Sequence, residues 1–170
     1  AVLLGVRTFN VLPELQYKNK ELFAYVKNGG NVIVQYNVSR GQLVTEDVAP
    51  YPLRVSVDRV TEEDAEVEFL APEHPALNFP NKISEADFDH WVQERGLYFP
   101  DTWDARFTPI LSMHDKGEDP KEGSLLVAKY GKGYYVYTGL SFFRELPAGV
   151  SGAYRLMANL ISLGKDEDKK

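Results

Sequence analysis

Polar side chains that can bind ligands follow three apolar segments of this 170-residue sequence. The segments cover residues 1–6, 32–34 and 109–113, and each is typical of a buried strand. Ligands of open parallel sheets bind beside the carboxyl ends of the strands, so we expect these side chains to meet there. Amides and a phenol can hydrogen-bond a ligand, and a guanidinium can bind a carboxylate or a phosphate. The candidate ligand-binding residues are Arg7, Asn10, Gln35, Tyr36, Asn37, Arg40, His114 and Asp115.

Two simpler interpretations stay open. The polar residues after the strands could do no more than close the strand ends through local hydrogen bonds, because position beside a strand is only a probabilistic argument for a site. His114 beside Asp115, with Glu118 close in sequence, has the residue types of an oriented general base. A hydrolase also needs a nucleophile within reach of that base, and none is evident. The second simpler interpretation is that His114 is a solvated loop histidine, because adjacency in sequence does not establish the geometry of a triad. A hydrolase using His114 is therefore the third candidate function, after a binding role and a structural role that are described below.

The composition excludes several kinds of chemistry. There is no cysteine, so the chain has no thiol nucleophile, no thiolate zinc site and no disulfide. The three histidines, His74, His90 and His114, are scattered, and we expect no metal and no other cofactor. A net charge of −6 argues against a nucleic-acid partner, which needs a basic surface. No stretch approaches the roughly 20 apolar residues that cross a membrane.

The elements that would position the candidate residues begin with a strand, helix, strand unit. Residues 19–27 have the apolar spacing of a helix, and Gly29 and Gly30 are typical of its end. Residues 32–34 then form the second strand. This order is typical of a βαβ unit in a parallel sheet.

The second half of the chain predicts a hairpin and a final helix. Residues 125–130 and 134–138 are expected to form an antiparallel hairpin, with positive φ at both turn glycines, and residues 152–163 form the last helix. The fold class that we expect is therefore α/β, a three-layer sandwich with a mostly parallel sheet and an antiparallel hairpin. One domain over residues 1–164 would be followed by a disordered charged tail, residues 165–170.

The middle of the chain is less regular. Residues 55–60 and 65–70 alternate like strands and are expected to form an antiparallel extension of the sheet. The remaining expectations are an extended loop over residues 72–81, a helix capped by Ser84 that runs to Arg95, irregular structure over residues 97–103, one strand over residues 109–113 and a loop through residues 147–149.

Several segments resemble the class I glutamine amidotransferase-like superfamily, particularly its ThuA-like and β-galactosidase trimerisation-like branches. Residues 4–10 (LGVRTFN) are similar to a strand end of these domains, and residues 25–34 (YVKNGGNVIV) to their helix, turn and strand. Residues 133–140 resemble a late strand. The resemblance is strongest to the amidotransferase-like domain of bacterial PIG-L (LmbE-like) deacetylases, in which similar runs recur at residues 74–83, 91–96 and 146–149.

This resemblance implies a flavodoxin-like fold without glutaminase activity. The nucleophilic cysteine of the superfamily falls at about Tyr36, and the histidine after its late strand falls at about Phe142. Residues 74–77 (HPAL) do not match the His-Pro-Asp-Asp zinc motif of the deacetylases, so a deacetylase active site would lie elsewhere in the parent protein. The superfamily places a strand and a helix before the segment that residues 1–6 match, and we expect that this chain lacks that unit.

The function that the resemblance implies is a non-catalytic accessory domain of a PIG-L-type N-acetylsugar deacetylase, which binds carbohydrate or positions the substrate. Glu94 and Arg95, with the aromatic residues Tyr98, Phe99 and Trp103, would suit a sugar-like ligand, and packing in the core is the simpler interpretation of the same residues. The alternative is a structural or oligomerisation module that contacts other domains of the parent protein. A bacterial parent acting on glycans would suit the periplasm or secretion, but no residue pattern decides the compartment.

Overall fold

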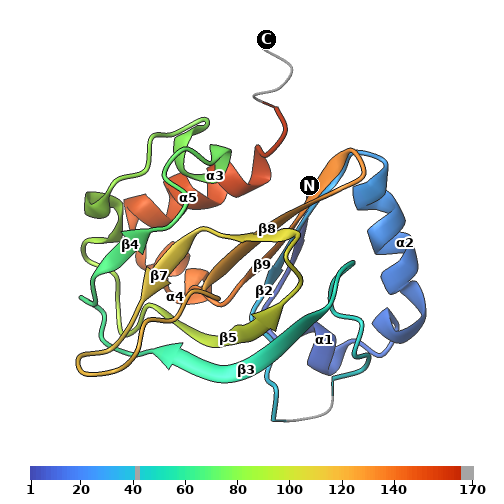
Figure 1. The fold of residues 1–170 in the computed structure, drawn as a ribbon, viewed down its shortest axis with the longest axis horizontal. Helices are drawn as coiled ribbons and strands as arrows, with labels where there is room; N and C mark the ends of the chain where they lie inside the picture. Colours follow the sequence, from blue (N-terminus) through green and yellow to red (C-terminus); the bar gives the residue numbers. More distant parts are fainter. Residues whose placement is uncertain (41–42, 166–170) are drawn as a thin grey trace.

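A five-stranded mixed sheet forms the centre of the molecule (Figure 1). The computed structural model describes residues 1–40 and 43–165; the remainder, including residues 166–170 of the expected tail, lies outside the described part. The strand order is β1-β2-β9-β8-β6. The strands are β1 (Val2–Leu4), β2 (Asn31–Gln35), β9 (Gly133–Thr138), β8 (Leu125–Tyr130) and β6 (Phe107–Pro109).

The sheet is parallel at one side and antiparallel at the other. Strands β1, β2 and β9 run parallel, with Val32 opposite Val2 and Tyr135 opposite Val32. Strand β8 pairs antiparallel with both β9 and β6. The predicted parallel unit and the predicted hairpin are therefore confirmed. In the hairpin turn only Gly131 has a positive φ (63°), whereas Gly133 is needed for space, because a Cβ there would lie 2.1 Å from the Gly30 carbonyl oxygen.

Helices cover both faces of this sheet, which gives three layers (Figure 1). Helices α1 (Thr8–Val11) and α2 (Leu15–Lys27) pack on one face, where the core includes Phe9 and Val26. Helices α4 (Phe142–Ala148) and α5 (Ser151–Ile161) pack on the other. Every residue of β2 and β9 is buried, as expected for strands covered on both faces.

Two helices that cover the central sheet were missed by the sequence analysis, and a third begins earlier than predicted. Helix α1 lies where we expected a strand end and a loop, and α4 begins directly after Ser141, where we expected only a loop. Helix α2 begins at Leu15 rather than at residue 19. Each is a short or terminal helical segment whose apolar residues are too few to show a clear period. Within the described ranges, no helix is long and apolar enough to cross a membrane.

Two antiparallel ribbons accompany the sheet instead of extending it. Strand β3 (Leu53–Val60) pairs with β5 (Gly96–Trp103), and β4 (Val67–Phe69) pairs with β7 (Leu111–Met113). The expectation of irregular structure over residues 97–103 was therefore wrong, because pairing with a strand about 40 residues earlier, interrupted by register shifts, leaves little local signal.

The predicted strand over residues 109–113 is divided between two sheets. Its first part belongs to β6 and pairs with β8, whereas its second part is β7 and pairs with β4. Ile110 lies at the point where the chain passes from one sheet to the other. Its N–H donates to Leu125 O, and its carbonyl accepts from Leu70 N–H. The apolar run was recognised correctly, but its partners are set by distant residues.

The β3–β5 ribbon crosses the carboxyl ends of the parallel strands (Figure 1). It is attached where Leu97 N–H donates to Gly139 O at 2.9 Å and Ser141 N–H donates to Arg95 O at 3.0 Å. The approach requires glycine on both sides, because a Cβ on Gly96 would lie 2.3 Å from Gly139 O and one on Gly139 would lie 2.7 Å from Leu97 O. This close approach places β5 over the strand ends.

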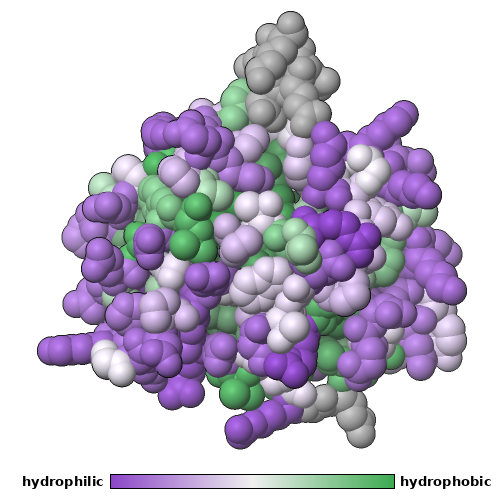
Figure 2. Space-filling model, in the orientation of Figure 1, coloured by the Kyte–Doolittle hydropathy of each residue, from purple (hydrophilic) through white to green (hydrophobic). Residues whose placement is uncertain are grey.

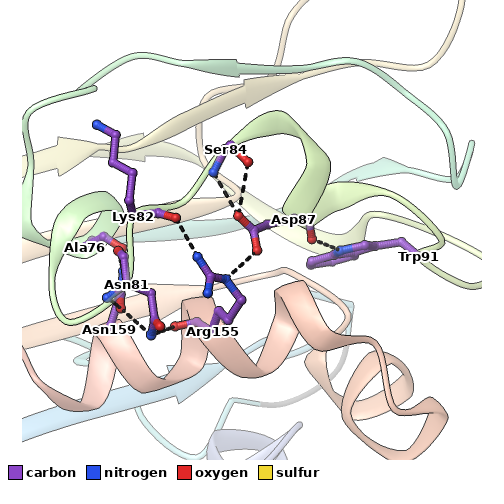
Figure 3. Close-up of polar contacts among 8 residues, drawn as sticks. All are labelled: Ala76, Asn81, Lys82, Ser84, Asp87, Trp91, Arg155 and Asn159. Carbon is purple, nitrogen blue, oxygen red and sulfur yellow. Dashed lines mark hydrogen bonds and ion pairs between the residues drawn. The ribbon is translucent and has the colours of Figure 1, made fainter.

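The segment between the ribbons is held on α5 by polar contacts (Figure 3). It contains the short helix α3 (Pro75–Asn78) inside the expected loop and the 3₁₀ helix η1 (Glu85–Phe88). The buried amide of Asn159 accepts from Asn81 N–H at 2.9 Å and donates to Ala76 O at 2.9 Å.

The helix predicted from Ser84 to Arg95 ends after one turn. The Asp87 carboxylate accepts from Ser84 N–H at 2.9 Å, as a capping residue should. Beyond η1, however, the N–H groups of Val92 and Gln93 donate to Glu145 and Glu63 instead of to helical carbonyls. These long-range carboxylates replace the local hydrogen bonds and stop the helix.

Changing Asn159 to Ala should reduce the free energy of unfolding by about 2–4 kcal/mol. The change leaves the Asn81 N–H and the Ala76 carbonyl buried without a partner, and each unsatisfied group costs about 1–3 kcal/mol. Urea denaturation measures the loss. The matched control is Arg155→Ala on the same helix, whose ion pair with Asp87 is 43% exposed on the arginine side and should contribute less than about 1 kcal/mol. Equal losses would show that Asn159 is not the anchor.

Candidate functional site

The first two predicted segments meet at the carboxyl ends of β1 and β2. Arg7 N–H donates to Tyr36 O at 2.7 Å, and Phe9 N–H donates to the side-chain oxygen of Asn37 at 2.8 Å. The turn after β1 therefore lies directly against the turn after β2. The structure thus brings these two segments together, as expected.

Two of the predicted residues there are structural. Asn37 is fully buried, donates through its side chain to Gln35 O at 3.1 Å and through its N–H to the Tyr137 hydroxyl at 3.0 Å. The Asn10 amide forms two hydrogen bonds with the backbone of Val38, at 2.8 and 3.0 Å. For both asparagines the simpler interpretation, local closure of a strand end, is the one that the structure supports.

His114 and Asp115 do not belong to this site. They follow β7, which pairs with β4 outside the central sheet. The Asp115 carboxylate accepts from Thr61 N–H at 2.7 Å and Glu62 N–H at 2.9 Å, and these bonds, against the opposing effect of burial, lower its pKa. The nearest contact of His114 is the Asp115 backbone oxygen, 3.0 Å from Nδ1. The acid therefore closes a loop and does not orient the histidine.

Glu94 and Arg95, expected beside a sugar, are both buried. Arg95 is 5% exposed, donates to Ala65 O and Phe88 O, and lies over the rings of Phe88 and Trp91. Burial lowers its pKa, and surrounding carboxylates oppose that effect. Arg95 is therefore a structural residue of the core.

Tyr36 forms an aromatic cluster with residues from two other elements. Its ring stacks on Tyr98 of β5, with centroids 5.6 Å apart and planes at 27°, and it meets Phe143 of α4 edge to face at 5.4 Å. All three residues are half-buried, so part of each remains exposed to solvent. We call these three residues the aromatic cluster. Tyr36 and Tyr98 were visible in the sequence as polar and aromatic candidates, whereas Phe143 was missed because α4 was missed.

Charged groups surround this cluster. Burial raises the pKa of the Tyr36 hydroxyl; the positive charge of Arg7 opposes that shift, and Glu94 adds to it. Glu94 is itself paired with Arg144, whose Nε lies 2.6 Å from its Oε1, and the Arg144 guanidinium lies over the Phe143 ring. Both signs of charge are therefore present beside the exposed ring edges.

Two residues that contact Tyr36 have a left-handed backbone conformation. Arg7, bonded to its carbonyl, has φ 61°, and Tyr98, stacked on its ring, has φ 53°. Among the residues that the structure describes, only two other non-glycine residues, His90 and Gln93, have positive φ. Such conformations cost about 1–3 kcal/mol each and are concentrated at functional sites.

A hollow of about 240 Å³ opens beside Tyr98. Its walls are Arg40, from the turn after β2, and Arg59 of β3. Its apolar lining is Val57 and Leu97. Arg59 had not been singled out in the sequence, because an arginine in an alternating strand is usually only its solvated face.

Two buried polar atoms at the same strand ends have no hydrogen-bond partner within the described part of the chain. They are Oε1 of Gln35, a residue that is 8% exposed, and Oγ of Ser124. Gln35 lies opposite Thr138, which lies opposite Leu125, the residue after Ser124. Buried polar atoms are nearly always paired in proteins, so unpaired acceptors here are a feature of this edge of the sheet.

No group of histidine, aspartate and glutamate side chains in the described ranges has the arrangement of a metal site. The residues that the site offers are aromatic rings, guanidinium groups, one paired carboxylate and the Gln35 amide. These groups can bind and orient a ligand through stacking and hydrogen bonds. They include no nucleophile with an adjacent base, which acyl transfer would need.

Behind the Glu94–Arg144 pair lies a fully buried carboxyl group, that of Glu145. It accepts from Val92 N–H at 2.9 Å and from the Ser141 hydroxyl at 3.2 Å. Burial raises its pKa above the ordinary value of 4.5, although both hydrogen bonds and Arg95 oppose the shift. The folded protein therefore holds the proton of Glu145 more tightly than the unfolded chain does.

The variant Glu145→Gln should gain stability relative to the original protein as pH rises. A raised pKa in the folded state gives a contribution that is complete below about pH 4.5 and is lost as pH rises through the folded pKa. Glutamine does not ionise, so its contribution does not change. Melting temperatures of both proteins between about pH 4 and pH 8 measure the difference, with the exposed Glu122→Gln as the control. Parallel curves for Glu145→Gln and the original protein would contradict the expectation.

Comparison with known proteins shows similarity in fold. No protein-family model matches the chain, and no curated protein does. Among solved structures, the cytoplasmic protein STM3548 from Salmonella typhimurium is 17% identical with a TM-score of 0.54; the match covers 95% of this chain and 69% of that one.

The comparison also found two further solved structures. The cytoplasmic protein STM1381 from Salmonella typhimurium LT2 is 16% identical with a TM-score of 0.55, over 93% of this chain and 67% of that one. A β-galactosidase from Bacillus circulans sp. alkalophilus has a TM-score of 0.49 and 14% identity, over 94% of this chain and 22% of the enzyme. At these identities the Salmonella structures support a shared mixed α/β fold and nothing about activity.

Proposed function

We propose that this chain is a non-catalytic ligand-binding domain, of the flavodoxin-like and amidotransferase-like type, that binds a carbohydrate at the aromatic cluster. The observation that carries the proposal is the stacked pair Tyr36 and Tyr98, with Phe143 at its edge, at the carboxyl ends of parallel strands. Sheets of this type bind ligands at that edge. Aromatic rings offer apolar faces at low entropic cost, and the neighbouring guanidinium groups can bind hydroxyl oxygens.

The positions of the two missing catalytic residues support binding over catalysis. By resemblance, Tyr36 and Phe142 occupy the places of an amidotransferase cysteine and histidine. Phe142 is fully buried, and its neighbour Phe143 contacts Tyr36, so the two places are close in space. A phenol and a phenyl ring cannot form and resolve a thioester. The fold would thus retain the position of an active site and use it to hold a ligand.

The parent protein that we propose is a bacterial PIG-L-type N-acetylsugar deacetylase. The support is the sequence resemblance at residues 25–34, 91–96 and 146–149. In such a protein this domain would position the glycan for a deacetylase active site on another domain. Its partners would be that domain and the carbohydrate.

The test is a titration of the folded chain against neutral sugars and N-acetylated and free amino sugars, read by calorimetry and by thermal shift. A ligand that binds only the folded state adds about 2.7 kcal/mol of stability at one hundred times its dissociation constant. A saturable heat for at least one sugar is expected. A panel without any saturable response would reject the carbohydrate proposal.

Replacing Tyr36 with Leu should weaken sugar binding about tenfold or more. The loss of a stacked ring removes about 0.5–1.5 kcal/mol beyond the buried area, and the area loss adds to it. Tyr36→Phe, which retains the ring, should lose less. The matched control is Tyr17→Leu on α2, where the tyrosine is 78% exposed. Equal affinities of Tyr36→Leu and Tyr17→Leu, with both folded, would place the ligand elsewhere.

A structural role is the second candidate, and one observation favours it. Strand β1 is an edge of the central sheet, and apolar side chains near it are exposed: Leu3 (46%), Val11 (66%) and Leu12 (41%). Exposed edges of this kind pair with or are covered by other chain segments. On the face drawn in Figure 2, by contrast, hydrophobic residues form small groups among hydrophilic ones. Light scattering that shows only monomer at high concentration would count against self-association.

A further inference from the structure

Three arginines have guanidinium groups without a hydrogen-bond or ion-pair partner among the residues that the structure describes. The sequence contains eight arginines. Five hold a carboxylate or a carbonyl group: Arg54 with Asp101, Arg106 with Asp104, Arg144 with Glu94, Arg155 with Asp87, and Arg95 with Ala65 and Phe88. The guanidinium groups of Arg7, Arg40 and Arg59 form no hydrogen bond or ion pair with any residue in the described part of the chain.

All three unpaired arginines lie beside the aromatic cluster. The backbone N–H of Arg7 donates to the Tyr36 carbonyl, and the positive charge of Arg7 opposes the rise in the pKa of the Tyr36 hydroxyl. Arg40 and Arg59 are two walls of the hollow that Tyr98 also lines. The turn that carries Arg40 is fixed against β3 by the Ser39 hydroxyl, which donates to Ser56 O at 3.0 Å. Residues from three separate segments of the chain thus bring positive charge to one place.

This arrangement is unusual for an acidic protein. The chain has 25 acidic and 19 basic residues, so carboxylates are abundant, and the other arginines have found carboxylate or carbonyl partners. Like charges that share a small hollow repel each other. The Glu94 carboxylate, whose charge adds to the rise in the pKa of Tyr36, is already paired with Arg144. An anion in the hollow would therefore gain two guanidinium partners without breaking any internal ion pair.

The shape of the hollow fits a ring that carries a charge. Val57 and Leu97 give it an apolar lining, and the Tyr98 ring provides a face on which a sugar can lie. Guanidinium groups bind carboxylate and phosphate oxygens through paired, charge-assisted hydrogen bonds. A volume of about 240 Å³ accommodates part of a monosaccharide.

We infer that the ligand is an acidic sugar, whose carboxylate, sulfate or phosphate binds between Arg40 and Arg59 while its ring lies against Tyr98 of the aromatic cluster. This inference rests on the proposed carbohydrate function and names the class of sugar. Arg7 adds positive charge at the Tyr36 end of the site. Neutral sugars would use the same rings and bind more weakly.

The experiment compares each neutral sugar with its acidic counterpart by calorimetry, using the whole chain. The pairs are glucose with glucuronate, galactose with galacturonate, and N-acetylglucosamine with its 6-phosphate; inorganic phosphate is titrated separately. At least one acid should bind about tenfold or more tightly than its neutral partner, which is about 1.4 kcal/mol. Raising the salt concentration should reduce this preference, because exposed charges are screened.

Variants assign the preference to the two arginines. Arg59→Ala and Arg40→Ala should each reduce the affinity for the acidic sugar about tenfold and reduce that for the neutral sugar less, because a neutral hydroxyl group forms a weaker hydrogen bond with a guanidinium than an anion does. Both side chains are exposed and unpaired, so folding should be retained, which circular dichroism checks. The matched control is Arg106→Ala, which removes the same charge from a pair with Asp104 and should leave the preference intact.

The outcomes separate this inference from the proposal beneath it. Equal binding of neutral and acidic sugars, unaffected by Arg59→Ala, would overturn the inference and retain the carbohydrate function. Equal binding of inorganic phosphate and the sugar acid would support the anion site and reject sugar recognition. Binding of no compound in any arm would reject both.

Discussion

The close approach of Gly96 and Gly139 is the constraint on which the rest of the site depends. With Cβ atoms at these positions, the backbones of β5 and of the turn after β9 could not come within hydrogen-bond distance. Because they do, the β3–β5 ribbon crosses the strand ends, and Tyr98 is placed two residues later on top of Tyr36. The hollow beside Tyr98 and the cluster with Phe143 both follow from that crossing.

The parts of the fold that could be predicted are those whose signal is local. The buried strand β2, the β8–β9 hairpin and α5 each have a clear period or turn within one segment. Strand β5 and the division at Ile110 were missed because their partners are distant in sequence. The helix predicted after Ser84 is shorter for the same reason, since the N–H groups of Val92 and Gln93 donate to carboxylates from other segments.

The candidate site shows the same limit. Arg7, Tyr36 and Arg40 were found because they directly follow strands of the parallel sheet. Arg59 and Phe143 come from a ribbon and a helix whose positions only the tertiary fold defines. His114 and Asp115 were misplaced because β7 leaves the central sheet. Residue type alone indicates neither that a residue belongs to the site nor that it does not, since an unpaired arginine and a paired one look alike in a sequence.

The crossing ribbon also separates the scaffold from the surface that meets a ligand. The central strands are buried on both faces and tolerate little change, whereas Val57, Arg59 and Tyr98 lie on a ribbon outside that core. Substitutions on the ribbon can alter what is bound without repacking the sheet. A domain built in this way can acquire new ligand preferences through a few exposed positions, so relatives with the same architecture need not share a ligand.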